Sequence, residues 1–89
     1  MKRCVMCAND GLAREFVRQV ASRASTKRTR SKVLMTWTVI AGKATTMVFS
    51  AKQDDVERRL QGLEFNDALF IGDVPDRVKT AVLTRVRVP

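Results

Sequence analysis

The residues of this chain with the most distinctive chemistry are Cys4 and Cys7, which form a Cys-x-x-Cys pair. This spacing supplies either half of a tetrahedral zinc site or a redox-active dithiol. Because the sequence has no histidine and no third cysteine, a four-ligand site would need ligands from two copies of the chain. A redox pair normally lies where a strand meets a helix N-terminus, and this pair precedes every strand that we predict. We therefore expect two ordinary reduced thiols, and a metal shared across a dimer stays open as the alternative.

The absence of histidine narrows the possible enzyme classes. Serine and cysteine nucleophiles lose their usual activating base, and the commonest acid or base at neutral pH is missing. Gly42 and Lys43 have the order found in a phosphate-binding loop, but Ala44 stands where Ser or Thr should bind magnesium and Trp37 where the first glycine should be. The sequence thus predicts no nucleotide site and no cofactor.

Three carboxylates near Lys79 offer a possible divalent-metal nuclease site: Asp67, Asp73 and Asp76. Each also has an ordinary structural explanation. Asp67 and Asp73 flank an expected strand, and Asp76 fits the first turn of a short helix. We therefore assign them structural roles and predict a protein that is not an enzyme, with no catalytic residue and no metal site.

Positive charge is concentrated in the first third of the chain. Residues 1–32 hold nine Lys or Arg against two acids, a net charge of +7, whereas residues 33–89 have a net charge of +1. Such asymmetry favours an anionic partner, most often a nucleic acid. Residues 22–32 also carry hydroxyl side chains, which commonly contact phosphate oxygens, and Arg14 and Arg18 lie one helical turn apart. The predicted nucleic-acid-binding residues are Arg14, Arg18, Arg23, Lys27, Arg28, Arg30 and Lys32.

These charges predict a small, basic, non-catalytic accessory protein that binds RNA or DNA mainly through phosphates. Little in the patch reads bases, because Trp37 is better explained as a core residue than as a stacking platform. The alternative is a protein-interaction module, such as a small viral or phage factor that docks on an acidic host or virion protein. Basic residues that serve solubility alone are a further explanation of the same pattern.

The elements that must position these residues follow from hydrophobic periodicity. Leu12, Phe16 and Val20 recur every fourth residue and predict a helix that begins near residue 10. Val33–Ile40 and Thr45–Ser50 alternate as the two strands of a hairpin. A capping box at 50–53 predicts a second helix that ends at Gly62. The expected remainder is a strand over 68–71, a short helix over 77–81 and a last strand over 82–88.

The order α-β-β-α-β-α-β predicts an α+β fold, a small two-layer sandwich with a mixed sheet in which the strands over 45–50 and 68–71 run parallel. With 89 residues the chain forms a single domain, 1–89, in which residues 1–9 and 22–32 are candidates for flexible basic segments. A domain of this size buries little surface, so pairing with a second copy would add stability, and a homodimer is a candidate assembly. The longest uncharged run, Val33 to Gly42, is far below the roughly 20 residues that cross a bilayer. We expect a cytoplasmic protein with no membrane contact.

Overall fold

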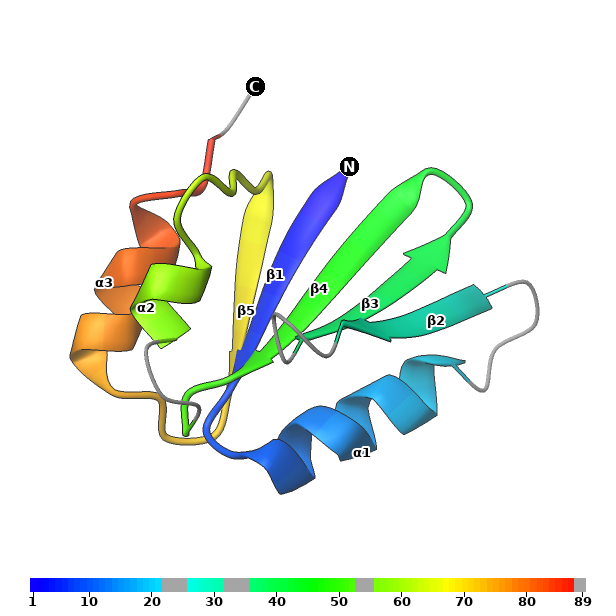
Figure 1. Ribbon diagram of the computed structural model, residues 1–89, viewed down its shortest axis with the longest axis horizontal. Coiled ribbons are helices and arrows are strands. Elements are labelled where there is room, and N and C mark those ends of the chain that lie inside the picture. The colour runs from blue at the N-terminus through cyan, green and yellow to red at the C-terminus, as the bar shows by residue number, and fades with distance from the viewer. Residues whose placement is uncertain (22–25, 32–35, 53–55, 88–89) are drawn as a thin grey trace.

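A computed structural model describes residues 1–21, 26–31, 36–52 and 56–87, with backbone alone at residues 21, 26–31, 36 and 41. Its elements follow one another as β1 (Lys2–Cys7), α1 (Asp10–Ala21), β2 (Thr26–Ser31), β3 (Thr36–Ala41), β4 (Ala44–Ser50), α2 (Val56–Arg59), β5 (Asp67–Ile71) and α3 (Asp76–Leu83). Figure 1 shows the strands fanned side by side, with α1 below β2 and β3, and α2 and α3 beside β5.

The strands of the described residues form one mixed sheet in the order β2-β3-β4-β1-β5. β1 runs parallel to both of its neighbours, β4 and β5, while β2, β3 and β4 form an antiparallel meander. The predicted mixed sheet is therefore confirmed, and β4 and β5 have the predicted parallel sense. They do not touch as ladder partners, however, because β1 lies between them.

Strand β1 corrects the expectation of a flexible segment over residues 1–9. The four residues Cys4–Cys7 are completely buried, since helices cover both faces of the sheet at this point. A parallel strand buried on both faces has a short continuous apolar run and not an alternating pattern. For this reason the segment carries no period-2 signal that would have revealed the strand.

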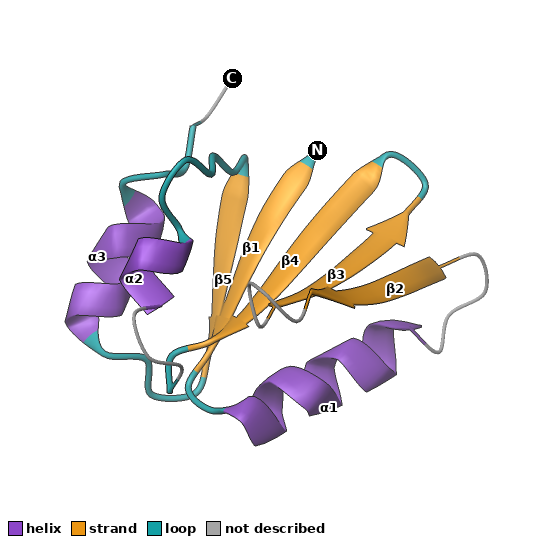
Figure 2. Ribbon diagram, in the orientation of Figure 1, coloured by secondary structure: helices purple, strands orange, loops and turns teal. Residues whose placement is uncertain are grey.

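The sheet is covered on both faces, so the fold has three layers and not the two that we expected (Figure 2). On one face Val5, Val39 and Val48 pack with Ala13 and Val17 of α1. On the other face residues of β1 and β4 pack with α2, α3 and the segment before β5; this cluster contains Cys4, Met6, Met47, Phe49, Val56, Leu60, Phe65, Val78 and Val82. The α+β class is confirmed. The third layer is explained by β1, an interior strand whose two faces both need apolar cover.

Helix α1 begins where its cap predicts. The Asn9 side-chain oxygen accepts a hydrogen bond from the backbone amide of Leu12 at 2.9 Å, which satisfies a donor that the first turn leaves unpaired. Ala13 and Val17 are buried, and Phe16 packs at the edge of the same cluster. The amphipathic pattern thus fixes both the start of the helix and the face that meets the sheet.

The predicted hairpin is confirmed as β3 and β4. Ala41 pairs with Ala44 across a two-residue turn, and Gly42 supplies the positive φ of 62° that such a turn requires. Within β4, Met47 and Phe49 join the cluster under α2 and α3, whereas Val48 joins the cluster under α1. Residues 33–35 of the predicted strand lie outside the described residues.

The C-terminal part differs from the predicted short helix and long strand. Val78 and Val82 are both buried at helical spacing, so α3 extends to Leu83 and takes up the start of the predicted strand over 82–88. After it, the chain makes an isolated parallel bridge between Phe65 and Val86. The β-branched alternation of this segment therefore gave the wrong element, because burial against the sheet favours the helical spacing of the two valines.

The second helix is the four-residue α2, and residues 53–55 of its predicted first turn lie outside the described residues. The helix ends at Arg59, three residues before the predicted end, and Gly62 has the expected left-handed conformation, with a φ of 79° in the turn that follows. In the described residues no helix is both long and apolar enough to cross a membrane.

Candidate nucleic-acid interface

The basic segment forms the edge strand of the sheet. Residues 26–31 form β2, which pairs with β3 on one side and is last in the strand order, and half of its six residues are basic: Lys27, Arg28 and Arg30. Within the segment 22–32, which we considered as a candidate flexible segment, residues 26–31 pair with β3 along an antiparallel ladder. Arg23 and Lys32, which we also predicted to bind, lie outside the described residues.

The register divides the basic residues of β2 between the two faces of the sheet. Arg28 and Arg30 pair with Val39 and Trp37, whose side chains pack in the cluster under α1. Lys27 pairs with Ile40, which alternates to the other face and is 41% exposed. Two of the three positions therefore lie on the side of the sheet that carries α1.

Helix α1 contacts β2 and brings two more predicted residues to that side. Arg14 and Arg18 are both exposed and lie one turn apart. Arg18 forms an ion pair with Glu15, and the hydrogen bond from Arg18 holds the pKa of the Glu15 carboxyl below its usual range. Arg14 makes no such pair with any described residue, so it is the α1 cation most open to an external anion.

Trp37 does not have the open position of a base-stacking platform. It is only partly exposed, packs against the apolar cluster under α1 and lies opposite Arg30 in the ladder. This agrees with its interpretation as a core residue.

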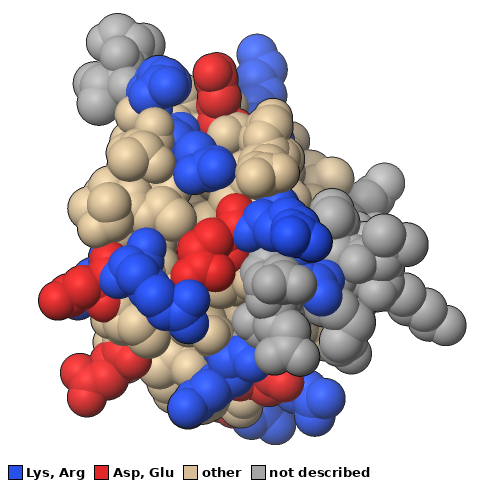
Figure 3. Space-filling model, turned by 60° about the vertical axis from the view of Figure 1, so that its left-hand side comes forward, with Lys and Arg blue, Asp and Glu red and all other residues tan. Residues whose placement is uncertain are grey.

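The side that carries α2 and α3 has a mixed surface. Figure 3 shows Lys and Arg side chains interleaved with Asp and Glu over this side, with no broad area of one sign. Arg77 of α3 pairs with Glu57 of α2, and Lys79 lies over the ring of Phe70 at 5.8 Å from its centroid.

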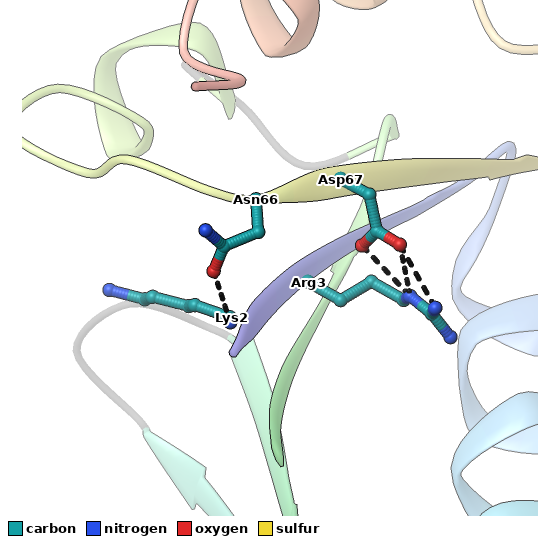
Figure 4. Close-up of polar contacts among 4 residues, drawn as sticks. All are labelled: Lys2, Arg3, Asn66 and Asp67. Atoms are coloured by element: carbon teal, nitrogen blue, oxygen red, sulfur yellow. Dashed lines mark hydrogen bonds and ion pairs between the residues drawn. The ribbon is translucent and has the colours of Figure 1, made fainter. Parts of the chain in front are cut away.

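The carboxylates that we considered as a metal site are kept apart by β5. Asp67 begins this five-residue strand and Asp73 follows its end, so the two lie at opposite ends of a segment of roughly 15 Å. Asp67 accepts a two-pronged hydrogen bond from Arg3, with Nε–Oδ1 and Nη2–Oδ2 distances of 2.9 Å (Figure 4). Asp76 begins α3, as predicted. Asp67 and Asp73 therefore cannot hold the same ion.

The two cysteines are also kept apart by the fold. Cys4 belongs to the cluster under α2 and α3, and Cys7 belongs to the cluster under α1. Burial raises the pKa of Cys4 to about 12 and that of Cys7 to about 11. The metal shared across a dimer, the alternative that the sequence left open, needs both thiols of each chain on one ion, and thiols on opposite faces of the sheet cannot provide this.

One basic cluster could not be found from the sequence. Lys2, at the start of the chain, lines a cleft with Arg85 and Arg87, which follow α3. No sequence signal joins residues so far apart, because their meeting depends on β1 lying next to β5.

Comparisons with known proteins bear on the fold. No protein-family model matches this sequence, and no curated protein matches it. A solved structure with a similar fold is the large terminase of a thermophilic bacteriophage, with a TM-score of 0.66 and 15% sequence identity. The similarity covers 98% of this chain and 23% of the terminase chain. The chain is thus similar in fold to a segment of a larger phage protein.

Proposed function

We propose that this protein is a small, non-catalytic nucleic-acid-binding domain whose edge strand β2 and helix α1 contact phosphates. The observation that carries the proposal is the position of the basic segment. Three of the six residues of β2 are cationic, the strand is last in the order of the described sheet, and it is contacted by α1, which carries the exposed Arg14. Phosphate contacts of this kind give affinity with little sequence preference.

The spacing of these residues suits a phosphate backbone. Arg28 and Arg30 are two positions apart on a strand, which is a rise of about 6.7 Å, and Arg14 and Arg18 are one helical turn apart, about 6 Å. Both pairs thus have spacings close to the interval between successive phosphates, and their backbone positions lie on the side of the sheet that carries α1. The other three residues of β2 carry hydroxyl groups: Thr26, Thr29 and Ser31.

Edge protection is the competing explanation for the charges of β2. Lys and Arg on an edge strand prevent it from pairing with the edge of another molecule. That role needs no partner and predicts that loss of the charges causes self-association. The phosphate role predicts that loss of the charges causes loss of binding.

The test is a fluorescence-anisotropy titration of a labelled 20-base-pair DNA duplex and of a single-stranded RNA of equal length. If about five phosphates are engaged on the duplex, log affinity falls with log salt concentration at a slope near −4.5. The variant K27A/R28A/R30A should bind at least tenfold more weakly. The matched control K52A/R58A/R77A removes three exposed cations elsewhere and should retain most of the affinity.

Absence of binding at low salt would overturn this function. An equal loss of nucleic-acid affinity in the test variant and the control variant would also overturn it. Sedimentation velocity on the same variants distinguishes edge protection from phosphate binding. A folded K27A/R28A/R30A protein that self-associates, with unchanged nucleic-acid affinity, would assign β2 to edge protection.

A second candidate is a protein-interaction module that works in a phage. The similarity in fold to a segment of a phage large terminase supports this candidate, although fold alone does not decide function. Affinity capture from infected-cell lysate, with and without nuclease, distinguishes the two. Partners that disappear with nuclease favour nucleic-acid binding, and a stoichiometric acidic protein that persists favours docking.

A further inference from the structure

We propose that the cleft at the amino end of β1 binds a phosphate monoester. The cleft has a volume of about 600 Å³, within the usual range for small-molecule sites. It is lined by Lys2, Gly62, Leu63, Glu64, Thr84, Arg85 and Arg87. The site is independent of the proposed β2 interface, because β3 and β4 separate β1 from β2 by about 14 Å in total.

Backbone hydrogen bonds hold together the three segments that form the cleft. The amide of Phe65 donates to the carbonyl of Arg85 at 2.9 Å, and the amide of Arg87 donates to the carbonyl of Phe65 at 2.7 Å. The next residue, Asn66, fixes the start of β1: its side-chain oxygen accepts from the amide of Lys2, and its own amide donates to the Lys2 carbonyl, both at 2.7 Å. The three cationic residues are therefore attached to a rigid frame.

Arg85 is held in position before any ligand binds. Its Nε donates to the carbonyl of Leu60 at 2.7 Å, and its Nη1 donates to the carbonyl of Ala81 at 2.8 Å. These bonds satisfy carbonyls at the ends of α2 and α3. Its Nη2 makes no hydrogen bond to the described residues, which leaves an oriented donor on a fixed guanidinium. A donor that is already ordered loses little entropy when an anion binds.

The other two cations are held less tightly. The Lys2 Nζ lies 5.7 Å from the centre of the Phe65 ring, and its side chain points away from that of Arg3 (Figure 4). Arg87 donates through Nη1 to the Thr84 carbonyl at 2.9 Å, and its Nε is 4.0 Å from the carboxylate of Glu64. Both side chains therefore keep donors for a ligand.

The charge of the cleft selects the ligand class. Three cations face one carboxylate, so an anion with two negative charges neutralises the site. A phosphate monoester carries −1.5 to −2 at pH 7 and offers three acceptor oxygens, whereas a phosphodiester carries a single charge. Arginine with a hydroxyl neighbour such as Thr84 is a common combination at phosphates.

The test is a series of amide chemical-shift titrations of the folded protein. The probes are inorganic phosphate, adenosine 5′-monophosphate with adenosine as control, and a hexanucleotide with or without a 5′-phosphate. We expect saturable shifts at Gly62 and Thr84 with the phosphorylated probes and none with adenosine. If adenosine 5′-monophosphate and the 5′-phosphorylated hexanucleotide bind with equal affinity, a free nucleotide is a sufficient ligand. If the 5′-phosphorylated hexanucleotide binds more tightly, the ligand is the 5′ end of a strand.

The variants K2Q and R87Q should each weaken binding of adenosine 5′-monophosphate at least fivefold. K52Q is the control and should leave the affinity unchanged, because the exposed Lys52 follows β4 at the carboxyl end of β1, away from the cleft. Since the chain has no histidine, affinity should also fall roughly fourfold from pH 7 to pH 5.5 as the ligand loses its second charge near pH 6. Absence of saturable shifts, equal shifts with adenosine, or unchanged affinity in K2Q and R87Q would overturn the proposal.

Discussion

Cys4 and Cys7 are both fully buried, and they point into opposite faces of the same strand. Three positions along a strand separate their Cα atoms by about 10 Å, which exceeds the roughly 7 Å limit for a disulfide. The Cys-x-x-Cys pattern is therefore a consequence of a doubly covered strand in β1. Each thiol acts as a small apolar side chain in its own cluster.

This burial predicts that neither thiol reacts in the folded protein. A thiol-reactive disulfide reagent at pH 8 should label both cysteines only at the rate of unfolding, because the reactive thiolate is suppressed and the sulfur is inaccessible. In guanidinium chloride both should react within minutes. Rapid labelling of one cysteine under native conditions would contradict the buried position.

The same groups predict a loss of stability at alkaline pH. The folded-state pKa values, about 12 for Cys4 and about 11 for Cys7, lie above the ordinary value of 9.0. Above pH 9 the unfolded chain therefore releases protons that the folded chain retains, and the free energy of unfolding falls as pH rises towards 11. Urea unfolding at pH 8, 9 and 10 measures this slope. The C4A/C7A variant should show a shallower slope, and an identical slope would remove the thiols as its cause.

Gly72 should tolerate alanine less well than Gly42 does. Both have a positive φ, so alanine costs about 1–2 kcal/mol at either position. A Cβ at Gly42 meets open space, whereas a Cβ at Gly72 would lie 2.8 Å from Leu12 Cδ1 and 3.0 Å from Ala8 Cβ. Overpacking should add roughly 1–3 kcal/mol to the cost of G72A. Chemical denaturation of the two variants checks the difference, and equal destabilisation would show that Leu12 yields at no cost.

Two arginines should contribute unequally to stability. R85Q removes donors from the carbonyls of Leu60 and Ala81 and should cost about 1–3 kcal/mol. R3Q removes an ion pair with Asp67 whose side chains are 45% and 40% exposed, so it should cost less than about 1 kcal/mol. Thermal and urea unfolding compare the variants. The reverse order would contradict the bracing role of Arg85 between α2 and α3.

E15Q should strengthen nucleic-acid binding at the proposed interface. Glu15 pairs with Arg18 and lies beside Arg14 on α1, so its removal frees a cation and deletes a repulsive charge. We expect affinity to rise between about 1.5- and fivefold, the range of an exposed ion pair. The control is E57Q, which frees Arg77 on the side of α2 and α3. An equal gain in both variants would indicate a general effect of net charge and no interface on α1.

Elements with a regular spacing of apolar residues were predictable, because that spacing indicates which face of the element is buried. Leu12, Phe16 and Val20 indicated α1, and Asn9 indicated its start. The β3–β4 hairpin followed from alternation on both sides of Gly42. The elements that failed lack such a signature: β1 is apolar on both faces, and the valines of α3 fit a strand and a helix equally well.

The sequence by itself determined a basic, histidine-free α+β chain with most of its excess charge in the first third. Local spacing was enough for that conclusion, since charge and periodicity belong to neighbouring residues. The tertiary structure alone decided that β1 is an interior strand, that its cysteines face apart and that Lys2 lines a cleft with Arg85 and Arg87. These contacts join positions at the two ends of the chain. They depend on which strands pair, and strand pairing is set by burial of the whole sheet and by no single segment of the sequence.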